Sequence, residues 1–200
     1  IISAEITPES LAPVTALLRR APVIWDNLFA DDYDVERFFA GPYSGRPRAL
    51  RGAVRGILLN PACELPLNAV PFHSFDRWLT GDGPWDPEAA LAEALRDWLP
   101  DFRLLDAAPG LPPRAPVSRE DLALLVDCFH LPFTPGRDAA ALLAGVRGVI
   151  AKPPAEWGAA EERALLLARR LERLANRLVD LADRALLHAL WRRLWPLREE

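Results

Sequence analysis

The chain has 200 residues, half of them apolar, which is enough to bury a real core in one or two domains. Its net charge of −4 argues against a nucleic acid as partner, because the phosphate backbone would be repelled. No run of about 18 apolar residues occurs, so we expect no membrane-spanning segment.

The composition also bears on origin and redox state. The first residues, IISAEITPES, lack a starting Met and the basic flank and apolar core of a signal peptide, so we expect a piece of a longer protein. Arg greatly outnumbers Lys, since Lys152 is the only lysine, which is typical of a GC-rich bacterial genome. Cys63 and Cys128 lie far apart in the sequence, and we expect thiols rather than a disulfide.

The N-terminal elements alternate between helix and strand. A helix is predicted over residues 7–20, with Thr7 as N-cap and Pro8 as first helical residue. Its apolar face consists of Leu11, Val14, Leu17 and Leu18. The short apolar run Val23–Trp25, after a proline, predicts a buried strand.

A second apolar run at 56–59 predicts another strand, after turn residues at 41–45 and a short connection at 49–54. A helix at 66–79 follows, and its apolar residues are Val70, Phe72, Phe75, Trp78 and Leu79. This order of elements is typical of parallel α/β structure.

Only helices are predicted beyond the turn-rich segment GDGPWDP at 81–87. We therefore divide the chain into residues 1–82 and 83–200, with a proline-rich linker at about 107–116. The expected helices run from Pro87 to about Leu99, from a Ser118–Asp121 capping box to the breakers at 131–136, over 137–149, and over about 155–194. The last carries a leucine seam and an alanine seam, so it must pack in a bundle or across a dimer. His188 falls on the leucine seam, where an interface or buried histidine is expected.

Polar side chains follow both predicted strands, where α/β enzymes place their sites. This position makes Asp32, Asn60 and Asn27 candidates for ligand binding, with the strand residue Trp25 and the loop residue Tyr33 beside them. Each also has a structural interpretation: Asp32 as a solvated loop acid, Asn60 as a turn residue before proline, and Trp25 as an ordinary buried tryptophan. We expect Asp26 to be a structural hydrogen-bonding residue and the Gly41–Tyr43 segment to shape a loop.

The pattern of Cys and His residues does not favour a metal. Cys63, His73, Cys128 and His130 are the thiol and imidazole groups at issue, and no CxxC pair occurs. Cys128 and His130, two apart on a helix, would point in different directions. We expect no metal and no cofactor.

Three motifs together resemble glycoside hydrolase family 84, the O-GlcNAcases. They are WDNxxxxDYD from Trp25 to Asp34, GPYxGR from Gly41 to Arg46, and GILxNP from Gly56 to Pro61. The continuation Cys63-Glu64, Asn68 and His73 is similar to the animal-type branch, and the likeness covers about residues 4–80. A later segment, PVSREDLALLVDCFHLPF at 116–133, resembles the stalk domain of these enzymes.

The resemblance implies the C-terminal portion of a (β/α)8 TIM barrel followed by a helical-bundle stalk. Because a whole barrel needs about 250 residues, residues 1–80 would hold its last two strands. It also implies that Asp32 binds the O4 and O6 hydroxyls of N-acetylglucosamine, Asn60 binds hydroxyls, and Asn27 lies by the acetamido group. Trp25 would form part of the wall for the acetyl methyl, and Tyr33 is a weaker rim candidate.

The implied activity is hydrolysis of O-linked N-acetylglucosamine from Ser or Thr of proteins, assisted by the acetamido group of the substrate through an oxazoline. The catalytic pair of neighbouring aspartates lies upstream of WDN in the family, so we assign no catalytic residue here, Asp31-Asp32 included. The resemblance further implies homodimerisation through the stalk helices. A cytoplasmic location in a bacterium with a GC-rich genome is expected.

Two other functions remain open from the sequence. One is a β-N-acetylhexosaminidase that acts on free glycans. The other is a helical dimerisation or sugar-binding module without catalysis.

Overall fold

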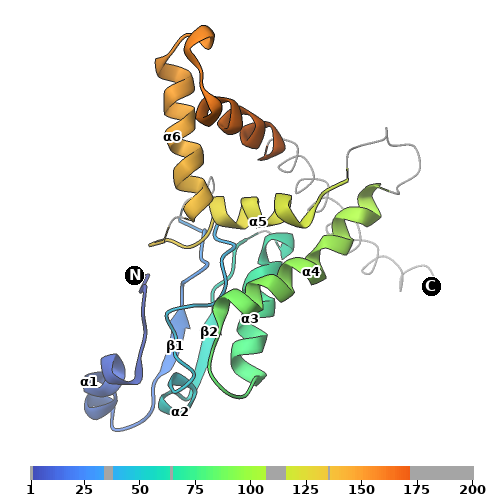
Figure 1. Cartoon of the computed structure of the whole chain (residues 1–200). Helices are drawn as coiled ribbons and strands as arrows, with labels where there is room; N and C mark the ends of the chain where they lie inside the picture. Colours follow the sequence, from blue (N-terminus) through green and yellow to red (C-terminus); the bar gives the residue numbers. More distant parts are fainter. Residues whose placement is uncertain (1, 34–37, 64, 107–115, 135, 172–200) are drawn as a thin grey trace, which may run out of the picture.

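The computed structural model describes residues 2–33, 38–63, 65–106, 116–134 and 136–171, apart from the side chains of 103–106. The fold is mostly helical around a small parallel sheet (Figure 1). The elements are α1 Pro8–Leu18, β1 Val23–Asp26, α2 Leu50–Ala53, β2 Gly56–Leu59, η1 Leu65–Asn68, α3 Ala69–Thr80, α4 Pro87–Asp106, α5 Arg119–Cys128, α6 Arg137–Ala151 and η2 Pro154–Glu156. A further helix covers residues 159–171.

Both predicted strands are confirmed, and they pair in parallel with Trp25 opposite Leu58. One face of this sheet packs on a core that includes Ile24, Leu28, Phe29, Phe39, Tyr43, Leu50 and Trp78. On the other face, Val23, Trp25 and Leu58 are exposed, Trp25 to 67%. The expectation of a strand buried on both sides is therefore wrong for the described residues, because nothing among them covers this second face.

The predicted helix starts are confirmed by hydrogen bonds. The Thr7 side chain accepts from the Ser10 amide at 3.2 Å, and the Ser118 side chain accepts from the Asp121 amide at 3.2 Å. Each is a capping box, which satisfies amides that have no partner within the helix. Half-buried Leu11 packs against the core, but the rest of the apolar face of α1 is exposed, with Leu17 at 84%, and α1 has no fully buried residue.

Helix α4 is longer than predicted. The sequence predicts an end near Leu99 because Pro100 follows, yet the helix continues through Pro100 to Asp106. Phe102, one turn after Trp98, is fully buried, and the centroids of these two rings lie 5.2 Å apart in an edge-on arrangement. Burial of this aromatic side chain offsets the hydrogen bond lost at the proline.

A second core joins the helices and reaches the segment after β1. Its buried residues are Ala40, Val70, Ala94, Leu95, Trp98, Phe102, Leu122, Leu125 and Val126. The amides of Ala40 and Gly41 donate to the carbonyls of Phe129 and His130 at 2.8 and 2.7 Å. Figure 1 shows α5 lying beyond the ends of the strands, with α6 extending away from the sheet.

Several predictions concern residues outside the described ranges. These are the linker at 107–115, the long helix beyond residue 171 with its seams, and His188. The described part of that helix begins at residue 159 rather than 155, since η2 occupies the residues after the proline pair. Cys63 and Cys128 are not joined by a disulfide in this structure. Within the described ranges, none of the helices has the length and apolar character to cross a membrane.

Candidate functional site at the strand ends

Two asparagines extend the sheet just past the carboxyl ends of its strands. Asn27 follows β1 and Asn60 follows β2, and the Asn60 amide donates to the Asp26 carbonyl at 2.8 Å. The Asn60 side-chain amide donates to Asn27 Oδ1 at 3.1 Å. The parallel register therefore brings these two predicted residues side by side at one edge of the sheet.

The acidic loop after β1 separates two neighbouring carboxylates. Asp31 is buried, and its Oδ1 accepts from the Cys63 amide at 2.9 Å, which ties this loop to the loop after β2. Asp32 and Tyr33 are exposed. The Asp31–Asp32 pair therefore does not act as a unit: the first holds the backbone, and the second is accessible to a ligand.

Trp25 lies on the exposed face of the sheet, next to Leu58. Within the described residues Trp25 is 67% exposed, so none of them buries its indole. An indole presented on a sheet face beside an amide pair offers an apolar surface to a ligand that also needs hydrogen bonds. The roles proposed for the five candidate residues stay predictions.

Asp26 is a structural residue, as predicted, and not an acid in contact with solvent. It is 1% exposed, and Arg46 donates to both of its oxygens, from Nε at 2.8 Å and from NH2 at 2.6 Å. The Tyr43 hydroxyl donates to Asp26 Oδ2 at 2.9 Å. Burial, and secondly the charge of Asp26, raise the pKa of the Tyr43 phenol, which therefore stays protonated as a donor.

The roles of Tyr43 and Arg46 were not predicted from the sequence, although both residues belong to the GPYxGR motif. Two glycines of this motif explain part of its spacing. A Cβ on Gly41 would lie 2.3 Å from the His130 carbonyl oxygen. Gly45 has a φ of +71°, and a Cβ there would lie 2.1 Å from the Ala4 carbonyl oxygen. The motif thus packs the loop closely against two other segments.

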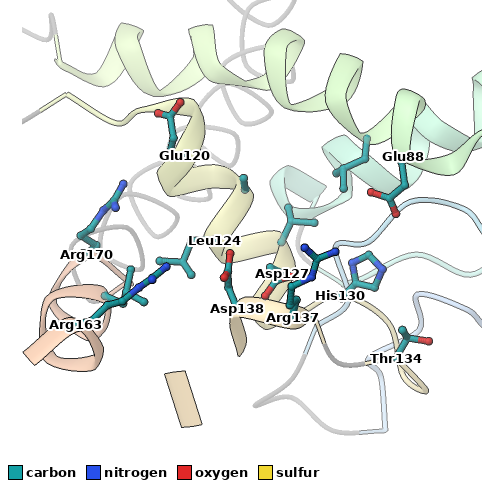
Figure 2. Close-up of a pocket in the computed structure, with 15 residues that line it drawn as sticks. Glu88, Glu120, Leu124, Asp127, His130, Thr134, Arg137, Asp138, Arg163 and Arg170 are labelled. Carbon is teal, nitrogen blue, oxygen red and sulfur yellow. The ribbon is translucent and has the colours of Figure 1, made fainter. Parts of the chain in front are cut away.

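A separate cavity of about 630 Å³ lies in the helical region (Figure 2). It is lined by α5, α6, the start of α4 and helix 159–171, and its walls carry both acidic and basic side chains. Asp127 Oδ2 accepts from the Ala139 amide at 2.7 Å, and Arg170 donates to Asp121 at 2.5 Å. None of the five predicted binding residues lines this cavity.

Metal-ligating residues do not gather in the described ranges, where no group of three or more His, Cys, Asp or Glu is suitably placed. Burial, followed by the charges of Asp127 and Asp138, raises the pKa of the Cys128 thiol to about 11. The Cys128 thiol is therefore protonated at neutral pH.

Comparison with known proteins identifies relatives. A family model described as beta-N-acetylglucosaminidase matches residues 1–105. The proteins named Protein O-GlcNAcase from Rattus norvegicus and Mus musculus are each 46% identical over 78 residues, 39% of this chain and 8% of theirs. The predicted resemblance to O-GlcNAcases is thereby confirmed.

The solved structure of a mutant O-GlcNAc hydrolase from Thermobaculum terrenum superposes with a TM-score of 0.54 at 20% identity. The match covers 92% of this chain and 35% of that one, and at this identity it shows similarity of fold alone. The chain therefore spans only a small part of the curated relatives and about a third of the structural one. Because the family model matches more than half of its residues, the chain belongs to the beta-N-acetylglucosaminidase family.

Proposed function

We propose that this chain supplies part of the sugar pocket of an enzyme that removes O-linked β-N-acetylglucosamine from Ser or Thr of proteins. The observation that carries the proposal is the Asn27–Asn60 pair at the carboxyl ends of two parallel strands. Membership of the family, and similarity to proteins named O-GlcNAcase, support the activity.

Each candidate residue is proposed to contact a different group of the sugar. The side-chain NH2 of Asn60 donates to Asn27 Oδ1. The Oδ1 of Asn60 has no partner in the described part of the chain, so it is available to accept from a sugar hydroxyl. Exposed Asp32 binds two adjacent hydroxyls, as its motif position implies. Asn27 lies beside the acetamido group, Trp25 contacts its methyl, and Tyr33 lies at the rim.

The proposed chemistry uses the substrate as its own nucleophile. The acetamido oxygen attacks the anomeric carbon, and the bond from this carbon to the Ser or Thr oxygen breaks as an aspartic acid protonates that oxygen. Water then opens the oxazoline and gives its proton back to the same aspartate. Asp31 is unsuited to this exchange because it is buried against the Cys63 amide. We therefore assign both catalytic aspartates to other residues of the enzyme.

We further propose that residues 1–82 form the end of a (β/α)8 barrel and residues 83–200 a helical stalk. The parallel pairing of β1 and β2 and the exposed apolar face of the sheet support a barrel whose other strands cover that face. The leucine and alanine seams of the last predicted helix support a homodimer through the stalk. We also propose a cytoplasmic location for the enzyme.

The test is the hydrolysis of an O-GlcNAc glycopeptide by the full-length protein that contains these residues. Asp32→Ala should lower kcat/KM by about 100-fold or more, since sugar hydroxyls lose a paired acceptor. The matched control is Asp82→Ala, which removes another exposed aspartate in a loop and should leave kcat/KM unchanged.

Two results would contradict the proposal. Activity of Asp32→Ala within about threefold of the unmodified enzyme would remove Asp32 from the pocket. Faster turnover of a chitobiose-type glycan than of the glycopeptide would favour the hexosaminidase alternative.

A further inference from the structure

A network of buried polar groups lies directly beneath the asparagine pair. Asp26, Tyr43 and Arg46 are each almost fully buried, and both Tyr43 and Arg46 donate to the Asp26 carboxylate. The Leu28 amide donates to the same carboxylate at 3.2 Å. The carboxylate therefore accepts four hydrogen bonds in a region without solvent.

Arg46 uses all five of its N–H donors. Two of them go to Asp26, and the others go to the carbonyls of Ser3 at 3.0 Å, Ala4 at 3.0 Å and Ser44 at 3.1 Å. A lysine cannot reproduce this fixed fork of donors. Arg46 thereby ties Asp26 to the N-terminal segment at residues 3–4 and to the loop at residues 44–46.

Asp26 in turn fixes the site. Its carbonyl accepts from the Asn60 amide at 2.8 Å, and the next residue in the chain is Asn27. Because strand side chains alternate, the Asp26 carboxylate points into the core while its neighbour emerges at the strand end. A shift of Asp26 would therefore move both asparagines, whose side chains are themselves joined at 3.1 Å.

We propose that Tyr43 and Arg46 are positioning residues of the sugar site, which act through Asp26 to orient the Asn27–Asn60 pair. This inference rests on the proposed function. It assigns to the GPYxGR motif a part in catalysis without contact with substrate.

The test uses Tyr43→Phe in the full-length enzyme, because this change removes one hydroxyl and keeps the ring in the core. The ring packs against Phe75 and Trp78 at 5.0 and 5.1 Å, so the variant should fold. We expect kcat/KM for the glycopeptide to fall about tenfold, as for loss of one hydrogen bond to a charged group.

Ser74→Ala is the matched control. Its hydroxyl is buried and accepts from the backbone amide of Tyr43 at 2.9 Å, so the change removes a hydrogen bond from the same residue without touching Asp26. We expect it to lower the melting temperature without changing kcat/KM. If Tyr43→Phe also changes the melting temperature alone, the residue is merely structural and the inference is overturned.

A double-mutant cycle with Asn27→Ala completes the test. If Tyr43 acts through Asn27, then Tyr43→Phe should change kcat/KM by less than about twofold once Asn27 is alanine. An undiminished effect in that background would overturn the positioning role and leave the proposed function intact. Unchanged kcat/KM in Asn27→Ala itself would instead overturn the proposed sugar site, and this inference with it.

Discussion

The ion pair between Asp26 and Arg46 is buried from solvent on both sides. Removing two charges from water costs several kcal/mol per ion, which is recovered only with good geometry and further hydrogen bonds. Both conditions hold, since the carboxylate is gripped at 2.6 and 2.8 Å and no guanidinium donor lacks an acceptor. Replacing both partners by apolar residues would therefore change the free energy of unfolding little. Removing only one partner would destabilise the protein strongly.

Arg46→Ala should therefore destabilise the protein by about 3–5 kcal/mol, because Asp26 would remain buried and unpaired. Urea unfolding monitored by circular dichroism measures this change. The control is Arg96→Ala, which breaks an exposed pair with Asp97 at 3.0 Å and should have little effect. Equal losses in the two variants would show that burial does not determine the value of the Arg46 pair.

At the scale of elements, the loop after β1 is fastened to the end of α5. Two backbone hydrogen bonds join Ala40 and Gly41 to Phe129 and His130, and the rings of Phe38 and Phe129 stack at 4.3 Å. The segment that follows the proposed sugar-binding loop is therefore held by the helical region, and this contact depends on a glycine.

Gly41→Ala should lower the free energy of unfolding by about 1–3 kcal/mol, because its Cβ would meet backbone atoms of His130. Gly52→Ala is the matched control. It lies in α2 with nothing within 4 Å of the new Cβ, so it should stabilise the protein by about 0.5–1 kcal/mol. Changes of the same sign in both variants would contradict the close contact at Gly41.

The turn between α6 and helix 159–171 is held by one carboxylate. Glu161 accepts from the Lys152 ammonium at 2.7 Å and from the Gly158 amide at 3.0 Å. The bond from Lys152 has the larger effect and the bond from Gly158 the next, and they lower the pKa of Glu161 from its ordinary value of 4.5 to about 2. Because the folded pKa is the lower one, the stabilisation is complete above about pH 4.5 and is lost as the pH falls towards 2.

Glu161→Gln should accordingly remove part of the pH dependence of stability between about pH 4.5 and 2. Melting temperatures of the two proteins across this range provide the measurement. We expect their difference to be largest near neutral pH and to shrink in acid. A difference that stays constant over the range would contradict a charged role for Glu161.

Local chemistry explains which elements the sequence could predict. Thr7 and Ser118 mark helix starts because a cap needs only neighbouring residues, and both were correctly predicted. The end of α4 was not, because burial of Phe102 by distant residues overrides the local signal of Pro100. The different burial of Asp31 and Asp32 was not predicted either, because it depends on a hydrogen bond to Asp31 from the Cys63 amide in the loop after β2.

For the whole molecule, the exposed apolar surfaces are the feature that the described residues do not explain. Val23, Trp25 and Leu58 form one such surface on the sheet, and Val14, Leu17 and Leu18 form another on α1. Contiguous apolar surface of this kind is typical of an interface. In the proposed barrel, the remaining strands cover the sheet surface around the sugar pocket.

Trp25 provides a spectroscopic test of that cover. Subtracting the emission spectrum of Trp25→Phe from that of the unmodified full-length enzyme gives the contribution of Trp25. This contribution should have the spectrum of an indole shielded from water. Emission should also respond to an N-acetylglucosamine analogue, because the indole would contact the acetyl methyl. Trp78→Phe, a change in the closed core, should show the shielded emission without the response. A water-exposed spectrum for Trp25 would contradict the barrel.

The most direct measurement is a crystal structure of the full-length protein bound to an N-acetylglucosamine analogue. We predict sugar hydroxyls within about 2.6–3.2 Å of the Asp32 and Asn60 side chains, with the acetamido group beside Asn27 and Trp25. A sugar bound in the cavity of Figure 2, or anywhere that leaves these four side chains without contact, would contradict it.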